Sequence, residues 1–455
     1  MRIIVIGAGE VGYNISDILS REGNDVVIID RNEERLKEVA ENIDVQTLQG
    51  SGSSPDILKK ARLDQSDMVV AVTDSDETNI VACLLAAVQS RAILKIARIR
   101  NPDLNRDTKI FDRNHLGIDL CINPEREAVT SIISLMEFPG ASEIIDFAEG
   151  RIKLAAFYVN GKCEALGKEL RDVKNSWGAQ DFLVASITRN GEPIVPTGKT
   201  VLQENDYLFV LSESQNVRNI LRFFGKDMAP PQRVFIMGGG NTSLMLSEAL
   251  EKKGLLLKIV EKRQDRCEYL ASVLDKAVIL HGDGTSQDLL KEENIQDADY
   301  FIAVTNDEEA NILGALLAKQ LGARKTIALI NRVDYTHLVP FVGIDAVMNP
   351  RQATISKILH FIRKGKIISA TPLRDEKAEA VEFIALETSE ITKKPLKNIK
   401  FPKGAIVGAI LRNDEVRIPW GDSVIEPGDR VILFTLRSVI PQMEKFLTVK
   451  LDYFA

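Results

Sequence analysis

Apolar residues in the first part of this chain fall in short runs separated by amphipathic stretches. Residues 3–7 read IIVIG, residues 25–30 read DVVIID and residues 67–73 read DMVVAVT. Between the first two runs lies GYNISDILSREG, in which apolar residues recur at helical spacing. Short apolar runs are typical of strands buried on both faces of a parallel sheet. The alternation therefore predicts a doubly wound, Rossmann-type α/β domain.

A different pattern follows. Residues 152–159 read IKLAAFYV, residues 181–196 read DFLVASITRNGEPIVP and residues 206–212 read DYLFVLS. These runs indicate strands, and the Asn190-Gly191 pair indicates a hairpin turn between two of them. A helical stretch within residues 212–225 comes next. We therefore expect a small α+β module after the larger domain.

The whole order is then repeated, which is the most informative feature of the sequence. Five segments align, at residues 3–30 with 234–261, 48–58 with 280–290, 67–80 with 299–312, 117–127 with 343–353, and 187–210 with 410–434. The pattern predicts a tandem duplication with domains at residues 1–137, 138–226, 227–363 and 364–455. We expect the link between the halves at residues 225–232, where two prolines follow a helix.

Composition narrows the classes of partner. The 455 residues carry a formal net charge of −7 without a long lysine or arginine run, which argues against a nucleic-acid partner. No uninterrupted apolar stretch approaches the roughly 18 residues that a transmembrane helix needs. The chain enters a strand and a glycine loop directly, so we expect neither a cleaved signal nor a transmembrane segment. Any role at a membrane would then depend on a partner.

A dinucleotide fingerprint follows the first strand and opens the first helix. Gly7 permits a tight turn, Gly9 leaves room for a phosphate, and Gly12 lets the helix and the strand pack closely. Asp30 ends the second strand, where a carboxylate accepts hydrogen bonds from ribose hydroxyls and repels a 2′-phosphate. This arrangement predicts NAD rather than NADP. ATP and ADP also present free ribose hydroxyls, and the residues alone do not choose between these ligands.

The second copy of the loop is altered. Its GGGNTS sequence keeps the two glycines nearest the phosphates, while Ser243 replaces the packing glycine. Glu261 stands where Asp30 does, and Asp283 stands where Ser51 does. The copy predicts a second nucleotide site, and the alternative is a loop retained for structure alone.

Other candidates lie at the carboxyl ends of later strands. Thr73 and Asp74 follow the fourth strand, at the edge where ligands bind in such sheets. Thr73, Asp74, Ser75 and Asp76 could equally be ordinary caps of the following helix. Arg98 ends the fifth apolar run and could reach a phosphate, with Arg100 as the competing candidate. The counterpart of Arg98 in the second half is Leu329, so the two halves differ there.

Residues for catalysis are sparse. The chain has four histidines and four cysteines, all scattered singly, so we expect a reduced compartment and no metal. No His–Asp arrangement lies near either glycine loop, and we expect His115 to be a half-buried structural residue. Two fingerprints without acid–base groups favour ligand sensing over chemistry. An NAD-dependent oxidoreductase is the alternative.

Taken together, these motifs resemble the TrkA family of Trk potassium-uptake regulators, whose units are tandem RCK domains (regulators of potassium conductance). The resemblance extends over essentially the whole chain and rests on GAGEVG, Asp30, VTDSDETN, GIDLCINPE and LQENDYLFVLS. It implies a non-catalytic cytoplasmic subunit, peripheral to the inner face of the membrane, that binds NAD(H) and also ATP or ADP. It also implies a homotetramer beneath a potassium-conducting subunit of the TrkH/TrkG type. A regulator of another cation transporter is a further alternative.

The resemblance also implies which residues bind the nucleotide. In the first half these are Gly7, Ala8, Gly9, Glu10, Val11, Gly12, Asp30, Ser51, Gly52, Thr73, Asp74 and Arg98. In the second half they are Gly238, Gly239, Gly240, Asn241, Thr242, Glu261, Asp283, Gly284, Thr305 and Asn306.

Overall fold

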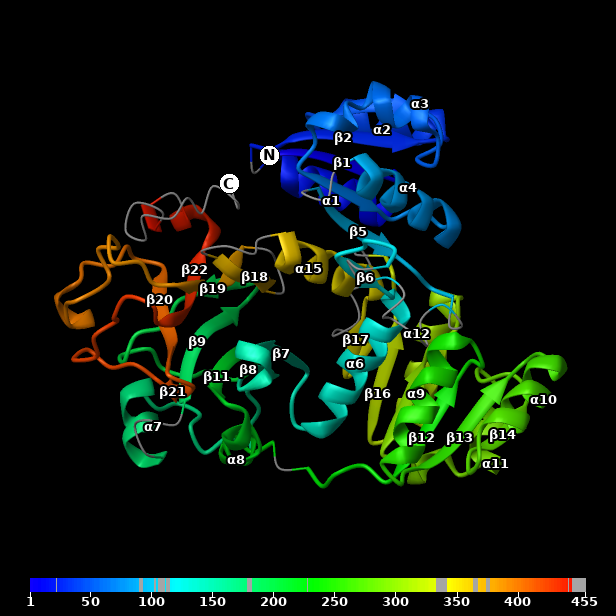
Figure 1. The fold of residues 1–455 in the computed structure, drawn as a ribbon. Coiled ribbons are helices and arrows are strands. Elements are labelled where there is room, and N and C mark those ends of the chain that lie inside the picture. The colour runs from blue at the N-terminus through cyan, green and yellow to red at the C-terminus, as the bar shows by residue number, and fades with distance from the viewer. Residues whose placement is uncertain are drawn as a thin grey trace.

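The structure is a computed structural model with four β-sheets (Figure 1). It describes residues 1–21, 23–89, 93–101, 104, 111, 115–177, 182–226, 228–332, 342–362, 367–373, 377–440 and 442–443. Two six-stranded sheets belong to the larger domains, and two five-stranded sheets belong to the smaller ones. The predicted fold class, a tandem pair of Rossmann-type domains each followed by a small domain, is confirmed.

The first large sheet is parallel and has the strand order β3-β2-β1-β4-β5-β6. Its strands are β1 (Arg2–Ile6), β2 (Asp25–Asp30), β3 (Gln46–Gln49), β4 (Met68–Ala71), β5 (Leu94–Arg98) and β6 (Leu120–Ile122). Its helical segments are α1 (Glu10–Arg21), α2 (Glu33–Asn42), α3 (Pro55–Lys60), η1 (Leu63–Gln65) and α4 (Asp76–Gln89). The strand order reverses between β1 and β4, which opens a crevice at their carboxyl ends.

The second large sheet repeats this topology with the order β14-β13-β12-β15-β16-β17. Its strands are β12 (Arg233–Met237), β13 (Leu256–Glu261), β14 (Val278–His281), β15 (Tyr300–Ala303), β16 (Lys325–Leu329) and β17 (Ala346–Met348). Its helical segments are α9 (Asn241–Lys252), α10 (Gln264–Val273), α11 (Gln287–Glu292), η5 (Ile295–Asp297) and α12 (Glu308–Gln320). An extended connection leads into β12, and both of its prolines lie in the described part.

The small domains are built on antiparallel sheets with the orders β10-β9-β11-β8-β7 and β18-β19-β22-β20-β21. The first contains β7 (Glu143–Phe147), η3 (Ala148–Gly150), β8 (Ile152–Tyr158), α7 (Leu170–Trp177), β9 (Phe182–Arg189), β10 (Glu192–Ile194), β11 (Tyr207–Glu213), η4 (Ser214–Asn216) and α8 (Val217–Phe223). The second contains β18 (Ile367–Leu373), β19 (Ala378–Ile384), η6 (Leu396–Asn398), β20 (Ala405–Arg412), β21 (Glu415–Arg417), β22 (Arg430–Leu436) and η7 (Arg437–Val439). The predicted turn at Asn190-Gly191 joins β9 to β10.

Two helices cross from one half of the chain to the other. Helix α6 (Pro124–Glu137) follows the first large sheet but packs against α9 of the second. Helix α15 (Pro350–Ile362) follows the second large sheet but packs against α1 of the first, and α6 and α15 also touch each other. Ile132 of α6 lies in one core with α9, whereas Ile358 of α15 lies in one core with β1 and α1. Each large domain is therefore completed by a helix of the other half.

The small domains share a core as well. Phe209 of the first packs in one apolar cluster with Phe434 of the second. At its edge the buried carboxylate of Glu382 accepts a 3.1 Å hydrogen bond from the backbone N–H of Ala148 and pairs with Arg430, which also contacts Glu149 at 2.8 Å. Burying a carboxylate is costly unless it is paired, so this contact across the boundary fixes how the two sheets meet.

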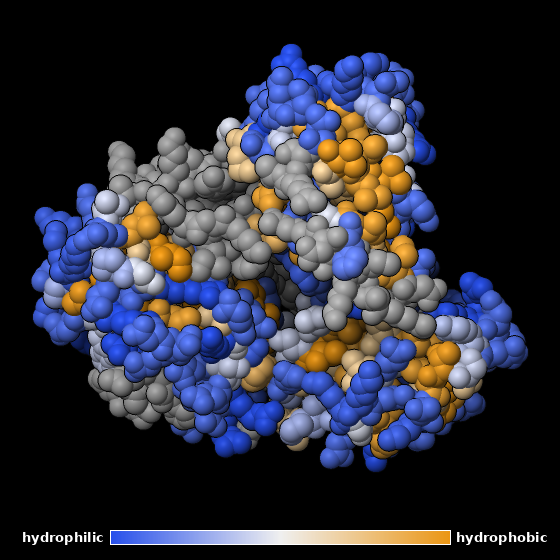
Figure 2. Space-filling view, viewed as in Figure 1, coloured by the Kyte–Doolittle hydropathy of each residue, from blue (hydrophilic) through white to orange (hydrophobic). Residues whose placement is uncertain are grey.

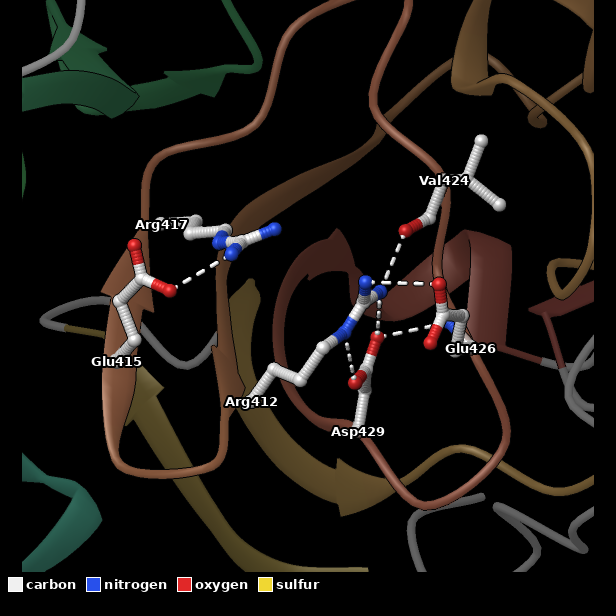
Figure 3. A network of polar contacts seen from close by, with 6 residues as sticks. All are labelled: Arg412, Glu415, Arg417, Val424, Glu426 and Asp429. Carbon is white, nitrogen blue, oxygen red and sulfur yellow. Dashed lines mark hydrogen bonds and ion pairs between the residues drawn. The ribbon is translucent and has the colours of Figure 1, made fainter.

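A pair between a half-buried arginine and a buried aspartate is repeated in both small domains. Figure 3 shows the second copy, where Arg412 donates to both carboxylate oxygens of Asp429 at 2.8 and 2.7 Å and to the carbonyl of Val424 at 2.8 Å. Arg189 and Asp206 make the same contacts in the first copy. Bidentate pairs of this kind hold a loop in one geometry. Both copies of the small domain have kept this pair together with the fold.

On the face shown in Figure 2 the coloured residues are mostly polar, with an apolar band over α4. Val81 and Val88 of this helix are exposed, and Leu313 is exposed on the matching helix α12. The other face of α4 is buried against the sheet at Ala82 and Ala86. Helix α4 is therefore apolar on both its buried and its exposed faces.

The exchanged helices allow a direct test. Ile358→Ala should loosen the first large domain although the residue lies far along the sequence, because a truncated buried isoleucine costs about 2–5 kcal/mol. Hydrogen exchange should then accelerate in β1 and α1 more than in β12 and α9. The matched variant Ile132→Ala should show the reverse, and equal effects on both domains would contradict the exchanged packing.

Candidate functional site

The first glycine loop lies where the order of the first large sheet reverses. Gly7 follows β1 with a φ of +107°, and a side chain there would press against the backbone of Thr73, with its Cβ 3.0 Å from the amide nitrogen. Gly238 has a φ of +105° and the same neighbour in Thr305. Only glycine adopts this conformation without strain. Both loops therefore make the tight turn that the sequence predicts.

The remaining loop positions differ in what surrounds them. A side chain on Gly9 would meet only the tip of Arg35, at 3.9 Å, and one on Gly240 would meet no atom within 4 Å. This open space is what a phosphate against the backbone requires. A side chain on Gly12 would overlap the carbonyl of Gly7, which confirms its packing role. Ser243 is fully buried at the matching place, so α9 and β12 accommodate a small side chain.

Both acidic residues at the end of the second strand hold their glycine loop. Asp30 accepts hydrogen bonds from the backbone N–H groups of Ala8 at 2.6 Å and Asn32 at 2.8 Å. Glu261 accepts from Gly239 at 2.6 Å and Arg263 at 2.8 Å. Carboxylate oxygens have further lone pairs, so both residues can hold the loop and still accept ribose hydroxyls. The additional methylene of Glu261 does not alter this arrangement.

A buried asparagine ties the fourth and fifth strand ends together. Asn79 accepts from the backbone N–H of Thr73 at 3.0 Å and from its hydroxyl at 2.7 Å, and it donates to the carbonyl of Arg98 at 2.8 Å. Asn311 repeats this network with Thr305 and Leu329. No local motif predicts a role for these asparagines, although each recurs at the matching place of the two halves.

The hydroxyl of Thr73 is thus engaged within the turn, where it also accepts from the N–H of Ser75 at 3.2 Å. Ser75 caps α4 by accepting from Thr78 at 3.1 Å, and Asp307 caps α12. Helix capping, the alternative interpretation of this segment, is therefore correct for Ser75 rather than for Thr73 or Asp74.

These elements surround a cavity of about 780 Å³, large enough for a nucleotide. It is lined by Gly7, Ala8, Gly9, Glu10, Val11, Asp30, Gly52, Thr73, Asp74 and Arg98 among the predicted residues. Gly12 and Ser51 are not part of the lining, and the Ser51 hydroxyl instead accepts from Arg31 at 2.9 Å. The lining also includes Tyr13, Arg35 and Arg351, which the sequence analysis did not identify.

The cavity concentrates arginines near the N-terminus of α1. Arg98 donates to the carbonyl of Thr73 at 3.2 Å, and burial lowers the pKa of its guanidinium, with Arg100 adding to the effect. Arg351 comes from α15 of the other half and forms an ion pair with Glu10. Backbone N–H groups at a helix start favour anions. The arrangement can therefore bind phosphates, with Arg98 rather than Arg100 facing the cavity.

The predicted residues of the second half stand at the matching places of their own sheet. Gly238, Gly239, Gly240, Asn241 and Thr242 lie between β12 and the first turn of α9, Glu261 ends β13, Asp283 and Gly284 follow β14, and Thr305 and Asn306 follow β15. Arg266 donates to the carbonyl of Gly239 and, at 3.4 Å, to Asn241. Lys262 pairs with Asp283 at 3.1 Å. Leu329, the counterpart of Arg98, is buried.

Groups for catalysis do not converge at either loop among the described residues. A Tyr-x-x-x-Lys spacing joins Tyr158 to Lys162, but it lies at the end of β8 and the following turn, in the first small domain. His115 is exposed, so the expectation of a half-buried histidine is wrong. Within the described ranges, no group of three or more His, Cys, Asp or Glu residues could hold a metal ion. In the same ranges no helix has the length and apolarity needed to cross a bilayer.

Family models match both halves of the chain. The TrkA-N domain matches residues 3–124 and 234–350, which are the two large sheets with their glycine loops. The TrkA-C domain matches residues 154–225 and 380–448. The chain belongs to the TrkA family. The predicted resemblance is thus confirmed, with each match falling once in each half.

Relatives that match over their full length belong to the same family. The Trk system potassium uptake protein TrkA of Halomonas elongata is 38% identical over 458 residues, covering 100% of both chains. TrkA homolog 1 of Methanosarcina mazei is 37% identical and covers 98% of this chain and 100% of its own.

Solved structures share the fold at low identity. The GsuK RCK domain has a TM-score of 0.59 at 17% identity, covering 98% of this chain and 95% of its own. The GsuK channel bound to NAD has a TM-score of 0.59 at 16% identity, covering 98% of this chain and 79% of its own.

Asn79 supplies a prediction for the framework of the site. Asn79→Ala should lower the free energy of unfolding of the first large domain by about 3 kcal/mol, because several buried hydrogen bonds are lost together. Scanning calorimetry should show an earlier transition. Thr78→Ala, one residue away on the same helix and half-buried, should leave that transition in place. Equal midpoints for Asn79→Ala and the wild type would contradict the role assigned to this network.

Proposed function

We propose that this chain is a non-catalytic, nucleotide-sensing regulatory subunit that gates a Trk-type potassium-uptake transporter. The observation that carries the proposal is the cavity at the first glycine loop, with Asp30, Arg98 and Arg351 in its lining. Membership of the TrkA family supplies the potassium-uptake context. The absence of an acid–base arrangement at either loop in the described residues favours sensing over chemistry.

The proposed ligand is NAD(H), ATP or ADP. All of these carry a ribose with free hydroxyls and two or more phosphates, which suit Asp30 and the start of α1 respectively. The structural similarity to the GsuK channel bound to NAD supports a dinucleotide. The cavity is large enough for any of the three ligands, so measured affinities are needed to choose between them.

The proposed assembly is a homotetramer, located in the cytoplasm and docked on a potassium-conducting membrane subunit of the TrkH/TrkG type. The exposed valines of α4 and the exposed Leu313 of α12 offer apolar surface for contacts between copies. The proposed mechanism is a change in the orientation of the domains when nucleotide binds, transmitted to the pore.

The energy required is modest. Moving a gate from mostly closed to mostly open needs about 5.5 kcal/mol of differential binding. With two sites in each of four copies, each site would supply roughly 0.7 kcal/mol. If only the first site of each copy binds, roughly 1.4 kcal/mol per site suffices, which is an ordinary allosteric coupling energy.

Calorimetric titration tests the ligand assignment. NADH, NAD, ATP and ADP should each be titrated into the wild type, Asp30→Ala and Glu261→Ala. Asp30→Ala should weaken binding at the first site, because it removes both the ribose acceptor and the hydrogen bond to Ala8. Loss in Asp30→Ala alone would mark the second loop as structural, and unchanged binding in both variants would refute the site assignment.

Transport measurements test the role in the cell. Deleting the gene should reduce potassium uptake, and Asp30→Ala should restore it less than the wild type does. Loss of another cation flux with potassium uptake intact would favour a different transporter. Steady oxidation of NADH with a small substrate by the pure protein would instead favour an oxidoreductase.

A further inference from the structure

Each glycine loop lies beside a charged residue from the other half of the chain, and this residue is basic at the first loop and acidic at the second. Glu10 opens α1 and forms an ion pair with Arg351, the second residue of α15. The duplication aligns Glu10 with Asn241 and Arg351 with Glu125, the second residue of α6. Helices α15 and α6 pack in the same way on the two large domains. The position that holds Arg351 beside the first loop holds Glu125 beside the second loop.

Arg351 is placed to contact a ligand. Arg351 lines the 780 Å³ cavity together with Gly9 and Glu10. The side chain of Arg351 is 37% exposed, and burial lowers the pKa of the guanidinium. A partly desolvated cation gains more from an anionic partner than one in open water.

Glu125 occupies the corresponding position near the second loop. It lines a smaller cavity of about 300 Å³ with Asn241 at the start of α9, and Asp74, Asp76, Glu77, Arg100 and Asn101 complete that lining. Burial raises the pKa of Glu125, while Arg100 and Arg98 oppose the rise. Of this lining only Asn241 belongs to the second loop, so Glu125 is an acidic group that the cavity places beside that loop. In the sequence, Leu329 stands where the first half has Arg98.

We propose that Arg351 is a specificity-determining residue of the first site, which binds nucleotide phosphates across the boundary between the halves, and that Glu125 makes the second site select against phosphate charge. This inference rests on the proposed nucleotide function and adds the residue that sets ligand charge. The first site takes nucleoside di- and triphosphates and dinucleotides. The second site favours ligands with fewer exposed phosphate charges.

A phosphate at the start of α1 competes with the carboxylate of Glu10 for the same guanidinium. Binding therefore replaces an ion pair within the protein by one to the ligand, and the anion also gains the N–H groups of the helix start. Arg351 begins α15, which packs against α1, α6 and β18. When Arg351 leaves Glu10 for the phosphate, the change therefore acts on α15, the helix that leads from the second large sheet into the second small domain.

The test uses the full chain carrying Glu261→Ala, so that the first site dominates, with adenosine, AMP, ADP and ATP as probes in calorimetry. Arg351→Ala should weaken ADP binding about tenfold or more, as expected for a lost charge-assisted hydrogen bond, and adenosine binding less than twofold. Arg351→Lys should retain much of the preference for ADP over adenosine. Glu10→Ala should tighten ADP binding, because Arg351 loses its internal partner.

Lys357→Ala is the matched control, since it removes another cation of α15 that pairs across the halves with Glu127 but does not line the cavity. It should leave all four affinities unchanged. Equal weakening of adenosine and ADP by Arg351→Ala, or unchanged ADP affinity, would overturn the proposal and leave nucleotide binding itself intact. If the parent chain binds none of the phosphorylated probes, the proposed function fails as well.

The second half of the proposal has its own test in a chain carrying Asp30→Ala. Glu125→Arg should tighten ADP binding at the second site about tenfold relative to adenosine, because it places a cation where the first site has Arg351. An unchanged ratio between ADP and adenosine would refute the role of Glu125.

Discussion

The exchange of α6 and α15 between the two halves is the constraint on which the rest of this structure depends. Helix α6 buries Ile132 in a core that includes residues of the second large domain, and helix α15 buries Ile358 in a core of the first large domain. The exchanged helices therefore pack the two halves against each other. The same exchange brings Arg351 to the first glycine loop, which makes the first site a joint product of both halves.

Duplication preserved the framework of the sites more closely than their charge. The loop glycines, the acidic residue that holds the loop, and the asparagines Asn79 and Asn311 make nearly the same contacts in both copies. These groups satisfy buried backbone atoms, so replacing them would cost stability in either copy. Arg98 and Leu329, by contrast, differ without disturbing the strand ends. The two loops therefore differ in nearby charge while keeping one architecture.

The small domains connect the two halves through a shared core. Their sheets share one apolar cluster, and Glu382 is paired at its edge with Arg430, which also reaches Glu149 across the boundary. The halves are thus joined both here and through α6 and α15. The proposed sensing role requires coupling between a site and a distant partner, and these contacts are the ones that could carry it.

The sequence alone determined most of the fold and the positions of the two glycine loops. The alternation of apolar runs predicted the parallel sheets, and the glycine spacing predicted both loops. Asp30 and Glu261 could be recognised as equivalent positions, because the local pattern shows where each second strand ends. The framework role of Asn79 was visible only as a repeated residue, since hydrogen bonds between strand ends have no local pattern. Only the tertiary structure decided that α6 and α15 exchange places, and hence that Arg351 lies at the first loop and Glu125 beside the second. Amphipathic periodicity shows that a helix has a face to bury, but the sheet that covers the face is chosen by packing between residues far apart in the chain.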